Sequence, residues 1–140
     1  MIDDRQYEEL LLALCIWRES RGEPYEGQLA VAHCVRNRVL NPKWWGSSYY
    51  SVVTKKWQFS SMTDPRDRQL TMFPDPGDER WHTARMIAAN VMEGLSSHPM
   101  PGADSYYADY IDPPKWATDD KRVGVIGHHV FYNIDEDTLD

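Results

Sequence analysis

The chain has 140 residues, enough for one domain that buries a hydrophobic core of its own. Its 22 acidic and 15 basic residues give a formal net charge of −7, which argues against nucleic acid or anionic lipid as the main partner. No apolar run approaches the roughly 20 residues of a membrane-spanning helix, so we expect no membrane insertion.

The first predicted helix covers residues 4–20. Its apolar residues recur at helical spacing: Tyr7, Leu10, Leu11, Leu14 and Trp17. Asp3 or Asp4 precedes them as the expected N-cap, and Gly22 ends the helix. We expect Tyr7 to pack in the core.

A second helix follows at once, from about Pro24 to Leu40, and Asn41-Pro42 ends it. Its apolar residues form a narrow face: Tyr25, Leu29, Ala32, Val35 and Val39. The small residues of this helix predict close packing against the first.

Residues 41–78 are rich in Pro, Gly, Ser and Trp and show little sustained periodicity. Connections of this length inside a compact domain are usually functional. A third helix is predicted from about Asp78 to Leu95, with these apolar positions: Trp81, Ala84, Ala88, Val91, Met92 and Leu95. Trp81 is expected to pack in the core.

Two short extended segments, residues 105–109 and 123–132, follow near the carboxyl end. They are able to pair as a small antiparallel ribbon. No repeat, linker or second domain is evident in the sequence. We therefore expect one domain over residues 1–140, of the α+β class and predominantly helical.

Cys15 and Cys34 each lie in a predicted helix among apolar neighbours, which indicates two buried free thiols. A disulfide between the helices is the alternative. His33 is adjacent to Cys34, but consecutive helical residues diverge by about 100°, so the pair is a poor nucleophile and base.

Glu19 stands out among the carboxylates because it ends a helix beside a sharp break, next to apolar and aromatic residues. An acid held there is desolvated, its pKa rises, and it is able to donate a proton near neutral pH. Glu23 and Glu26 begin the second helix, where its dipole and free amides favour a structural role. On spacing alone, an ion pair with Arg21 explains Glu19 better than catalysis does.

Residues 17–32 begin Trp-Arg-Glu-Ser-Arg-Gly-Glu-Pro-Tyr-Glu-Gly-Gln and resemble the opening motif of the SleB-type cell wall hydrolases, roughly Gly-Glu-Ala-Arg-Gly-Glu-Pro-x-Glu-Gly-Gln. Three further blocks stand in the family's order: residues 57–61, residues 105–107 with Trp116 after them, and residues 126–132. Together the four blocks cover about residues 10–133. The chain is thus identified as similar to the spore cortex-lytic enzyme catalytic domains.

The chain departs from the family pattern at four positions. Trp17-Arg18 stands where the family commonly has Tyr-Gly, Ser20 replaces Ala, and His128 replaces Asn. An arginine beside the acid would lower the pKa of the acid. We expect Arg18 to point away from the cleft, because adjacent helix residues diverge.

The resemblance implies a fold similar to soluble lytic transglycosylases and goose-type lysozymes, which cleave between N-acetylmuramic acid and N-acetylglucosamine with one essential Glu. Glu19 is then the catalytic acid, peptidoglycan glycan strands are the partner, and no cofactor or metal is needed. The residues expected to bind the glycan are these: Trp57, Gln58, Phe59, Ser60, Tyr106, Tyr107, His129 and Tyr132. Aromatic faces among them are suited to stack on sugar rings.

Three alternatives stay open at this point. The first is a hydrolytic muramidase, in which water rather than an internal hydroxyl completes the reaction. The second is a zinc-dependent N-acetylmuramoyl-L-alanine amidase, although the chain has no His-Glu-x-x-His and consecutive His128 and His129 would face opposite sides of a strand. The third is a non-catalytic glycan-binding module, which only the six Trp and eight Tyr favour.

The start of the sequence, residues 1–5, lacks the basic region and apolar stretch of a signal peptide. We therefore expect a monomer that stays cytoplasmic until it is released to the cell wall, as a phage endolysin does. A bacterial wall-remodelling enzyme without its export segment is the alternative.

Overall fold

The computed structural model of the chain describes residues 3–135 and 138. The first helix, α1, runs over Asp4–Ser20, as predicted. Asp3 is its N-cap: the Asp3 carboxylate accepts from the Gln6 N–H at 2.8 Å, and the Gln6 side chain accepts from the Asp3 N–H at 3.0 Å. This reciprocal pair satisfies two of the free amides at the start of the helix.

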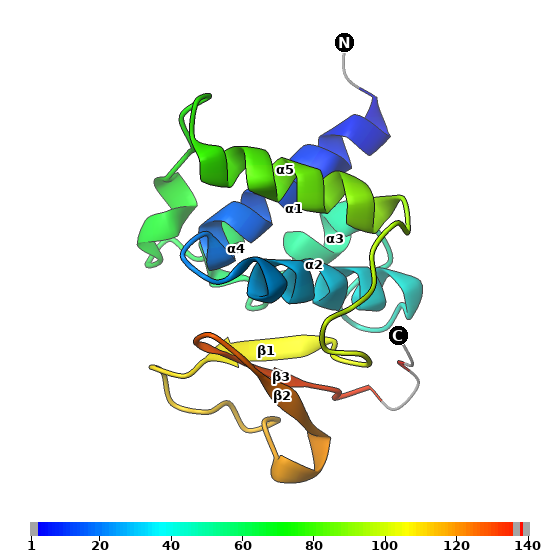
Figure 1. Cartoon of the computed structure of the whole chain (residues 1–140). Helices are drawn as coiled ribbons and strands as arrows, with labels where there is room; N and C mark the ends of the chain where they lie inside the picture. Colours follow the sequence, from blue (N-terminus) through cyan, green and yellow to red (C-terminus); the bar gives the residue numbers. More distant parts are fainter. Residues whose placement is uncertain (1–2, 136–137, 139–140) are drawn as a thin grey trace.

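The second helix, α2, runs over Tyr25–Leu40 and lies between the other helices and the sheet (Figure 1). One face belongs to the helical core: Leu29, Ala32 and Val35. The opposite face packs toward the sheet: Ala30, Val31 and Cys34. The prediction of one narrow apolar face on α2 is therefore wrong, because the helix is buried on two sides. Tyr25, which was expected to belong to that face, is exposed.

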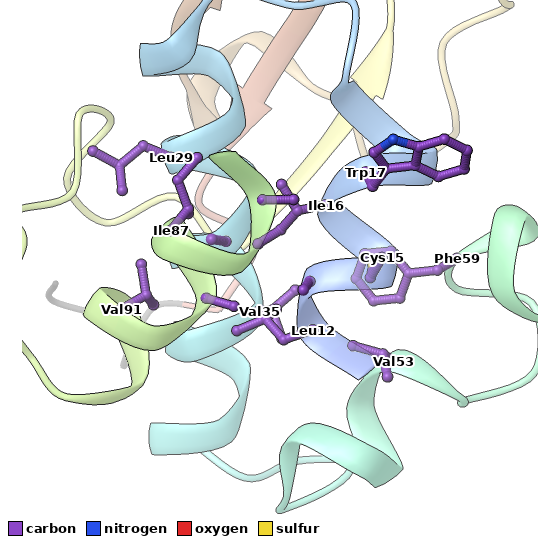
Figure 2. Packing of buried hydrophobic residues seen from close by; sticks show 14 of the residues in the cluster. Leu12, Cys15, Ile16, Trp17, Leu29, Val35, Val53, Phe59, Ile87 and Val91 are labelled. Carbon is purple, nitrogen blue, oxygen red and sulfur yellow. The ribbon is translucent and has the colours of Figure 1, made fainter. Parts of the chain in front are cut away.

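The third long helix, α5, runs over Glu79–Met92 and is capped by Asp78, whose carboxylate accepts from the Arg80 N–H at 2.9 Å. It ends before the predicted Leu95, because Gly94 adopts a positive φ of 74° that stops the helix. Figure 2 shows Leu12 and Ile16 of α1 packed with Ile87 of α5.

Two aromatic core predictions have different outcomes. Trp81 packs against the helical core from α5, as predicted. The core prediction for Tyr7 is wrong: its side chain is 46% exposed, because the first turns of α1 project beyond the helical layer (Figure 1). The Tyr7 ring lies instead beside that of Tyr50, with 6.1 Å between centroids.

The segment between α2 and α5 contains short helical pieces that the sequence pattern did not predict. They are α3 (Tyr49–Val53), α4 (Ser60–Thr63) and the 3₁₀ turn η1 (Arg68–Thr71). Each has five residues or fewer, which is too short to display helical periodicity. No helix in the described ranges has both the length and the apolar character needed to cross a membrane.

The sheet has three antiparallel strands in the order β1-β3-β2. They are β1 (Ser105–Ala108), β2 (Arg122–Ile126) and β3 (His129–Tyr132), with the short 3₁₀ turn η2 (Asp119–Lys121) before β2. The prediction of one strand over residues 123–132 is wrong. Gly127, with a φ of 57°, turns the chain, so this run is a hairpin.

The predicted α+β class, mainly helical with a small antiparallel element, is confirmed. Cys15 and Cys34 are buried free thiols, as predicted. They lie in different layers: Cys15 belongs to the helical core, and Cys34 belongs to the cluster that α2 forms with Phe131 of β3.

Candidate active site

A cleft of about 1070 Å³ opens where the end of α1, the segment around α4 and the sheet meet. Glu19 of α1 lines it, together with residues 57–61 and 66–69 of the connection and residues 105–108 of β1. Three parts of the chain that are far apart in sequence therefore meet around one carboxylate.

Glu19 lies in the last turn of α1 and is half-buried. The Tyr106 hydroxyl donates a hydrogen bond of 2.5 Å to Glu19 Oε1. Burial raises the pKa of Glu19, the negative charge of Asp67 adds to this, and the nearby Ser61 and Tyr106 oppose it without cancelling it. Glu19 thus keeps its proton to a higher pH than an ordinary glutamate.

The structure does not place Arg21 as a partner that would tie down Glu19. The Arg21 guanidinium lies over the Trp17 ring, 4.0 Å from its centroid, and donates to Gln69 Oε1 at 2.6 Å. The ion-pair interpretation of Glu19 therefore loses its proposed partner.

Arg18 corrects another expectation, because it lines the cleft rather than pointing away from it. Its buried guanidinium donates to the carbonyl oxygens of Ser61 and Met72, each at 3.1 Å. Adjacent helix residues do diverge at their Cα–Cβ bonds. The arginine side chain is nevertheless long enough to reach the connection between α2 and α5, where Ser61 and Met72 lie. Arg18 thus holds the backbone beside Glu19.

Two polar atoms of the cleft residues are buried and have no hydrogen-bond partner in the described part of the chain: Ser61 Oγ and His129 Nδ1. Ser61, only 1% exposed, lies close enough to Glu19 to lower the pKa of the carboxyl, but not in the geometry of a hydrogen bond. Burial lowers the pKa of His129, so its imidazole is neutral at neutral pH. Unpaired buried polar atoms are costly, and a bound ligand is one way to satisfy them.

Seven of the eight residues expected to bind glycan line the cleft: Trp57, Gln58, Phe59, Ser60, Tyr106, Tyr107 and His129. The eighth, Tyr132, is buried behind this wall. Its ring packs against those of Tyr107 and Trp116, with centroids 5.9 and 5.5 Å away. Tyr132 is thus placed to support two aromatic residues of the cleft.

Trp57 combines an exposed side chain, 71% accessible, with a backbone φ of 72°. A bulky residue in the left-handed region stores strain of about 1–3 kcal/mol, and such strain clusters at functional sites. Phe59, two residues later, is buried and packs near Tyr106, with 6.4 Å between centroids.

Two further carboxylates, Asp64 and Asp67, line the same cleft. Asp67 accepts from Ser60 Oγ at 2.6 Å and caps η1 through the Gln69 N–H at 2.8 Å. Asp64 is held by Arg66 at 3.0 Å. No motif or spacing pointed to Asp67, because its position depends on the fold of the connection.

Glu23 has a structural role, as predicted, but this role extends beyond the start of α2. Its carboxylate accepts from the His128 N–H in the β2–β3 turn at 2.7 Å. Glu23 therefore ties the hairpin, and with it His129, to the entrance of α2. His128 lies in this turn and is exposed, whereas His129 begins β3 and is buried. The two side chains therefore diverge as expected, but the placement of His128 on a strand is wrong.

Arg38 is a cleft residue that sequence reasoning missed. This buried guanidinium donates to the Asp104 carbonyl at 2.7 Å, to Ser105 Oγ at 3.2 Å and to Gln58 Oε1 at 3.3 Å. Arg38 therefore joins α2, β1 and the connection. Across residues 3–135 and 138, no group of three or more His, Cys, Asp or Glu side chains is placed to hold a metal ion.

Comparison with known proteins shows a relation to wall-degrading enzymes. The sequence profile of the cell wall hydrolase family matches residues 22–132, beginning three residues after Glu19. Spore cortex-lytic enzymes of Halalkalibacterium halodurans and Bacillus subtilis are each 31% identical to the chain, over 123 and 121 residues. These matches cover 88% and 86% of the chain but only 34% and 36% of those proteins, so the chain spans about a third of their length.

Two solved structures share the fold. The catalytic domain of the germination-specific lytic transglycosylase SleB from Bacillus anthracis superposes with a TM-score of 0.70 at 25% identity, covering 94% of this chain and 96% of that one. The catalytic domain of the Bacillus cereus SleB protein gives a TM-score of 0.70 at 27% identity, covering 91% and 90%. The profile match, the sequence relatives and the shared fold together show that the chain belongs to the cell wall hydrolase family and is of the SleB type.

Proposed function

We propose that this chain cleaves the glycosidic bond between N-acetylmuramic acid and N-acetylglucosamine in peptidoglycan, as a lytic transglycosylase that uses Glu19. The observation that carries the proposal is a half-buried carboxyl of raised pKa on the wall of a large cleft, with one hydroxyl donor in contact. Membership of the cell wall hydrolase family supports the choice of substrate.

In the first step, protonated Glu19 donates its proton to the glycosidic oxygen. The bond between that oxygen and the muramoyl C1 breaks, and the bonding electrons leave with the oxygen. The positive charge that develops at C1 is stabilised by the substrate's own N-acetyl group, a recognised exception to schemes with two carboxylates. The raised pKa of Glu19 keeps the proton available for this step.

In the second step, ionised Glu19 accepts the proton of the muramoyl C6 hydroxyl, and that oxygen bonds to C1 to close a 1,6-anhydro ring. No water is consumed, and Glu19 returns to its protonated form. The Tyr106 hydroxyl, which donates to Oε1, stabilises the ionised state between the two steps. Ser61, which lowers the pKa of the Glu19 carboxyl, favours the same ionised state.

A hydrolytic muramidase is the second candidate, because Asp64 and Asp67 line the same cleft. A second carboxylate across the scissile bond is the usual means of activating water. Mass spectrometry of the soluble muropeptides separates the two reactions. Anhydromuropeptides, lighter than the hydrolysis products by one water, support transglycosylation, and exclusively reducing muramic acid ends would assign the chain as a lysozyme.

The catalytic assignment is tested with Glu19→Gln, which keeps the shape of the side chain but removes the acidic proton. We expect the clearing rate of a purified wall suspension to fall by at least about 10²–10⁴-fold, the usual contribution of a general acid. Glu26→Gln is the matched control, because Glu26 is exposed in the first turn of α2 and should retain wild-type activity. Wall clearance at the wild-type rate by folded Glu19→Gln would refute the role of Glu19.

Chelation distinguishes the proposed reaction from that of a zinc amidase. Because no step of the proposed reaction involves a metal, activity should be unchanged after dialysis against EDTA. Activity lost on chelation and restored by zinc would point to cleavage of the peptide stem instead.

The role as a phage endolysin, the monomeric state and the cytoplasmic location before release stay predictions. Comparing clearance of vegetative walls with clearance of spore cortex fragments tests the endolysin role, because an endolysin must degrade vegetative walls. Sedimentation analysis tests the monomer.

A further inference from the structure

A smaller pocket of about 300 Å³ adjoins the cleft on the side of the connecting segment. Trp57, Thr63, Asp64 and Arg66 line both hollows, so the two share a wall. Lys56 lines the smaller pocket only. A ligand in the cleft that carries a side branch therefore has a second recess beside it.

The pocket lies close to the reacting groups. Ser61, which influences Glu19, and Thr63, which lines the pocket, are both in α4. Two residues of an α-helix advance about 3 Å along its axis. The short helix α4 thus connects the wall beside Glu19 with the pocket, and the four shared lining residues mark where a branch of a cleft-bound sugar would pass into it.

The charge around the pocket is opposite to that of the whole chain. Residues 55–68 carry four cations and two acids, whereas the net charge of the chain is −7. Both acids have partners: Arg66 holds Asp64 and the Ser60 hydroxyl donates to Asp67. Lys56 is exposed and makes no ion pair with any residue that the structure describes, and its ammonium lies 4.9 Å from the Trp57 ring centroid. An anion in the pocket would be attracted by this ammonium, which, unlike the Arg66 guanidinium, is not already paired with a carboxylate in the part of the chain that the structure describes.

The shared wall includes Trp57, the exposed aromatic with a positive φ. Burial of the indole does not offset the strain of this backbone conformation, because the side chain is mostly exposed. An observed backbone outlier at a cleft is evidence for a functional constraint. Here the constraint presents one indole to both the cleft and the pocket.

We propose that the Lys56 pocket binds a carboxylate of the peptide stem that branches from muramic acid, while the glycan occupies the cleft. This inference rests on the proposed function, and it adds the peptide stem to the parts of the substrate that the enzyme binds. Lys56 supplies the positive charge, and Trp57 separates the stem from the sugar. The enzyme then distinguishes glycan that carries stems from glycan without them.

The test measures binding in the Glu19→Gln background, so that the glycan is not degraded. The probes are soluble glycan strands with intact stems and the same strands after an amidase has removed the stems. Lys56→Gln should weaken binding of the stem-bearing strands by about twofold to fivefold at low salt, the range for an exposed charge pair, and leave the stem-free strands unchanged. Lys55→Gln is the matched control, because Lys55 is an exposed neighbour that does not line the pocket.

The outcomes separate this inference from the proposed function. Equal loss for both probes, or no loss for either, would overturn the pocket assignment while glycan binding itself upholds the proposed substrate. Failure of both probes to bind the parent Glu19→Gln protein would count against the proposed function as well. Chemical shift perturbation by the free stem peptide then tests the pocket separately, and an unperturbed Trp57 indole signal would overturn it.

A second variant, Trp57→Gly, tests the shared wall. Glycine adopts the φ of 72° without strain, so the thermal midpoint should not fall. The affinity for stem-bearing strands should nevertheless decrease, because the indole lines both hollows. Unchanged affinity in a folded Trp57→Gly protein would show that the indole has no part in binding.

Discussion

The hydrogen bond between Tyr106 and Glu19 gives a quantitative test of the site. Tyr106→Phe removes only the hydroxyl, and the ring keeps its packing against His129 and Phe131, whose centroids lie 4.9 and 5.8 Å away. The hydroxyl donates to the carboxylate and so favours the ionised form of Glu19. Its loss should raise the pKa of Glu19 beyond the value already raised by burial.

The size of the shift follows from the strength of the lost bond. A hydrogen bond to a charged group contributes about 1.5–3 kcal/mol, and one pKa unit corresponds to about 1.4 kcal/mol. The full effect is therefore about 1–2 units, and water entering the open cleft should reduce it to about 1 unit. Because the ionised intermediate loses its donor as well, we also expect a lower rate at the optimum pH.

The assay is the pH profile of kcat/KM on purified walls, in which the basic limb reports the acid in the free enzyme. We expect this limb to move to higher pH in Tyr106→Phe. Tyr110→Phe is the control, because it removes a hydroxyl from an exposed residue of the same cleft. A basic limb that stays in place or moves to lower pH would refute the inferred electrostatics of Glu19.

Two further predictions concern stability. Burial, with the charges of His98 and Arg36 adding to it, lowers the pKa of His33 from 6.5 to about 4, so the unfolded chain takes up a proton that the folded protein does not. The free energy of unfolding should therefore fall by about 2–3 kcal/mol as the pH drops from about 6.5 to about 4. Urea titrations of the wild type and of His33→Gln over this pH range measure the effect. The same pH dependence in both proteins would contradict the prediction. In Gly127→Ala, the new Cβ would lie 2.4 Å from Glu23 Oε1 at a φ of 57°, so calorimetry should show a loss of about 1–3 kcal/mol. Gly77→Ala, where nothing lies within 4 Å of the added Cβ, should be close to neutral, and equal effects of the two changes would argue against the strain.

The long helices could be predicted because each keeps its apolar spacing over 14 residues or more. The two-sided burial of α2 could not, since small residues on both faces show only weak periodicity. The hairpin was missed because residues 123–132 read as one extended apolar run. The structure shows that the chain turns at Gly127, which has a positive φ, and that the two halves of the run pair with each other.

Glu19 and the seven expected glycan-binding residues that line the cleft come from the motifs of the family resemblance, whereas about half of the cleft wall lies outside those motifs. The residues that were missed or misplaced act across long separations in sequence. Arg18 binds a carbonyl 54 positions away, and Arg38 binds one 66 positions away. Local spacing carries no information about such pairs. A charged residue on a helix is ordinarily predicted to lie on the solvent-exposed face, whereas both of these arginines are buried.

The position of α2 between two hydrophobic clusters has a consequence for how the molecule opens. Each cluster contains one cysteine, Cys15 on the helical side and Cys34 on the sheet side, and burial raises the pKa of both thiols. Both are fully buried, so neither reacts with an alkylating reagent before its own layer separates from α2. The chain therefore carries a natural reporter in each layer. Because one helix completes both clusters, alkylation at a single common rate would identify the whole molecule as one cooperative unit.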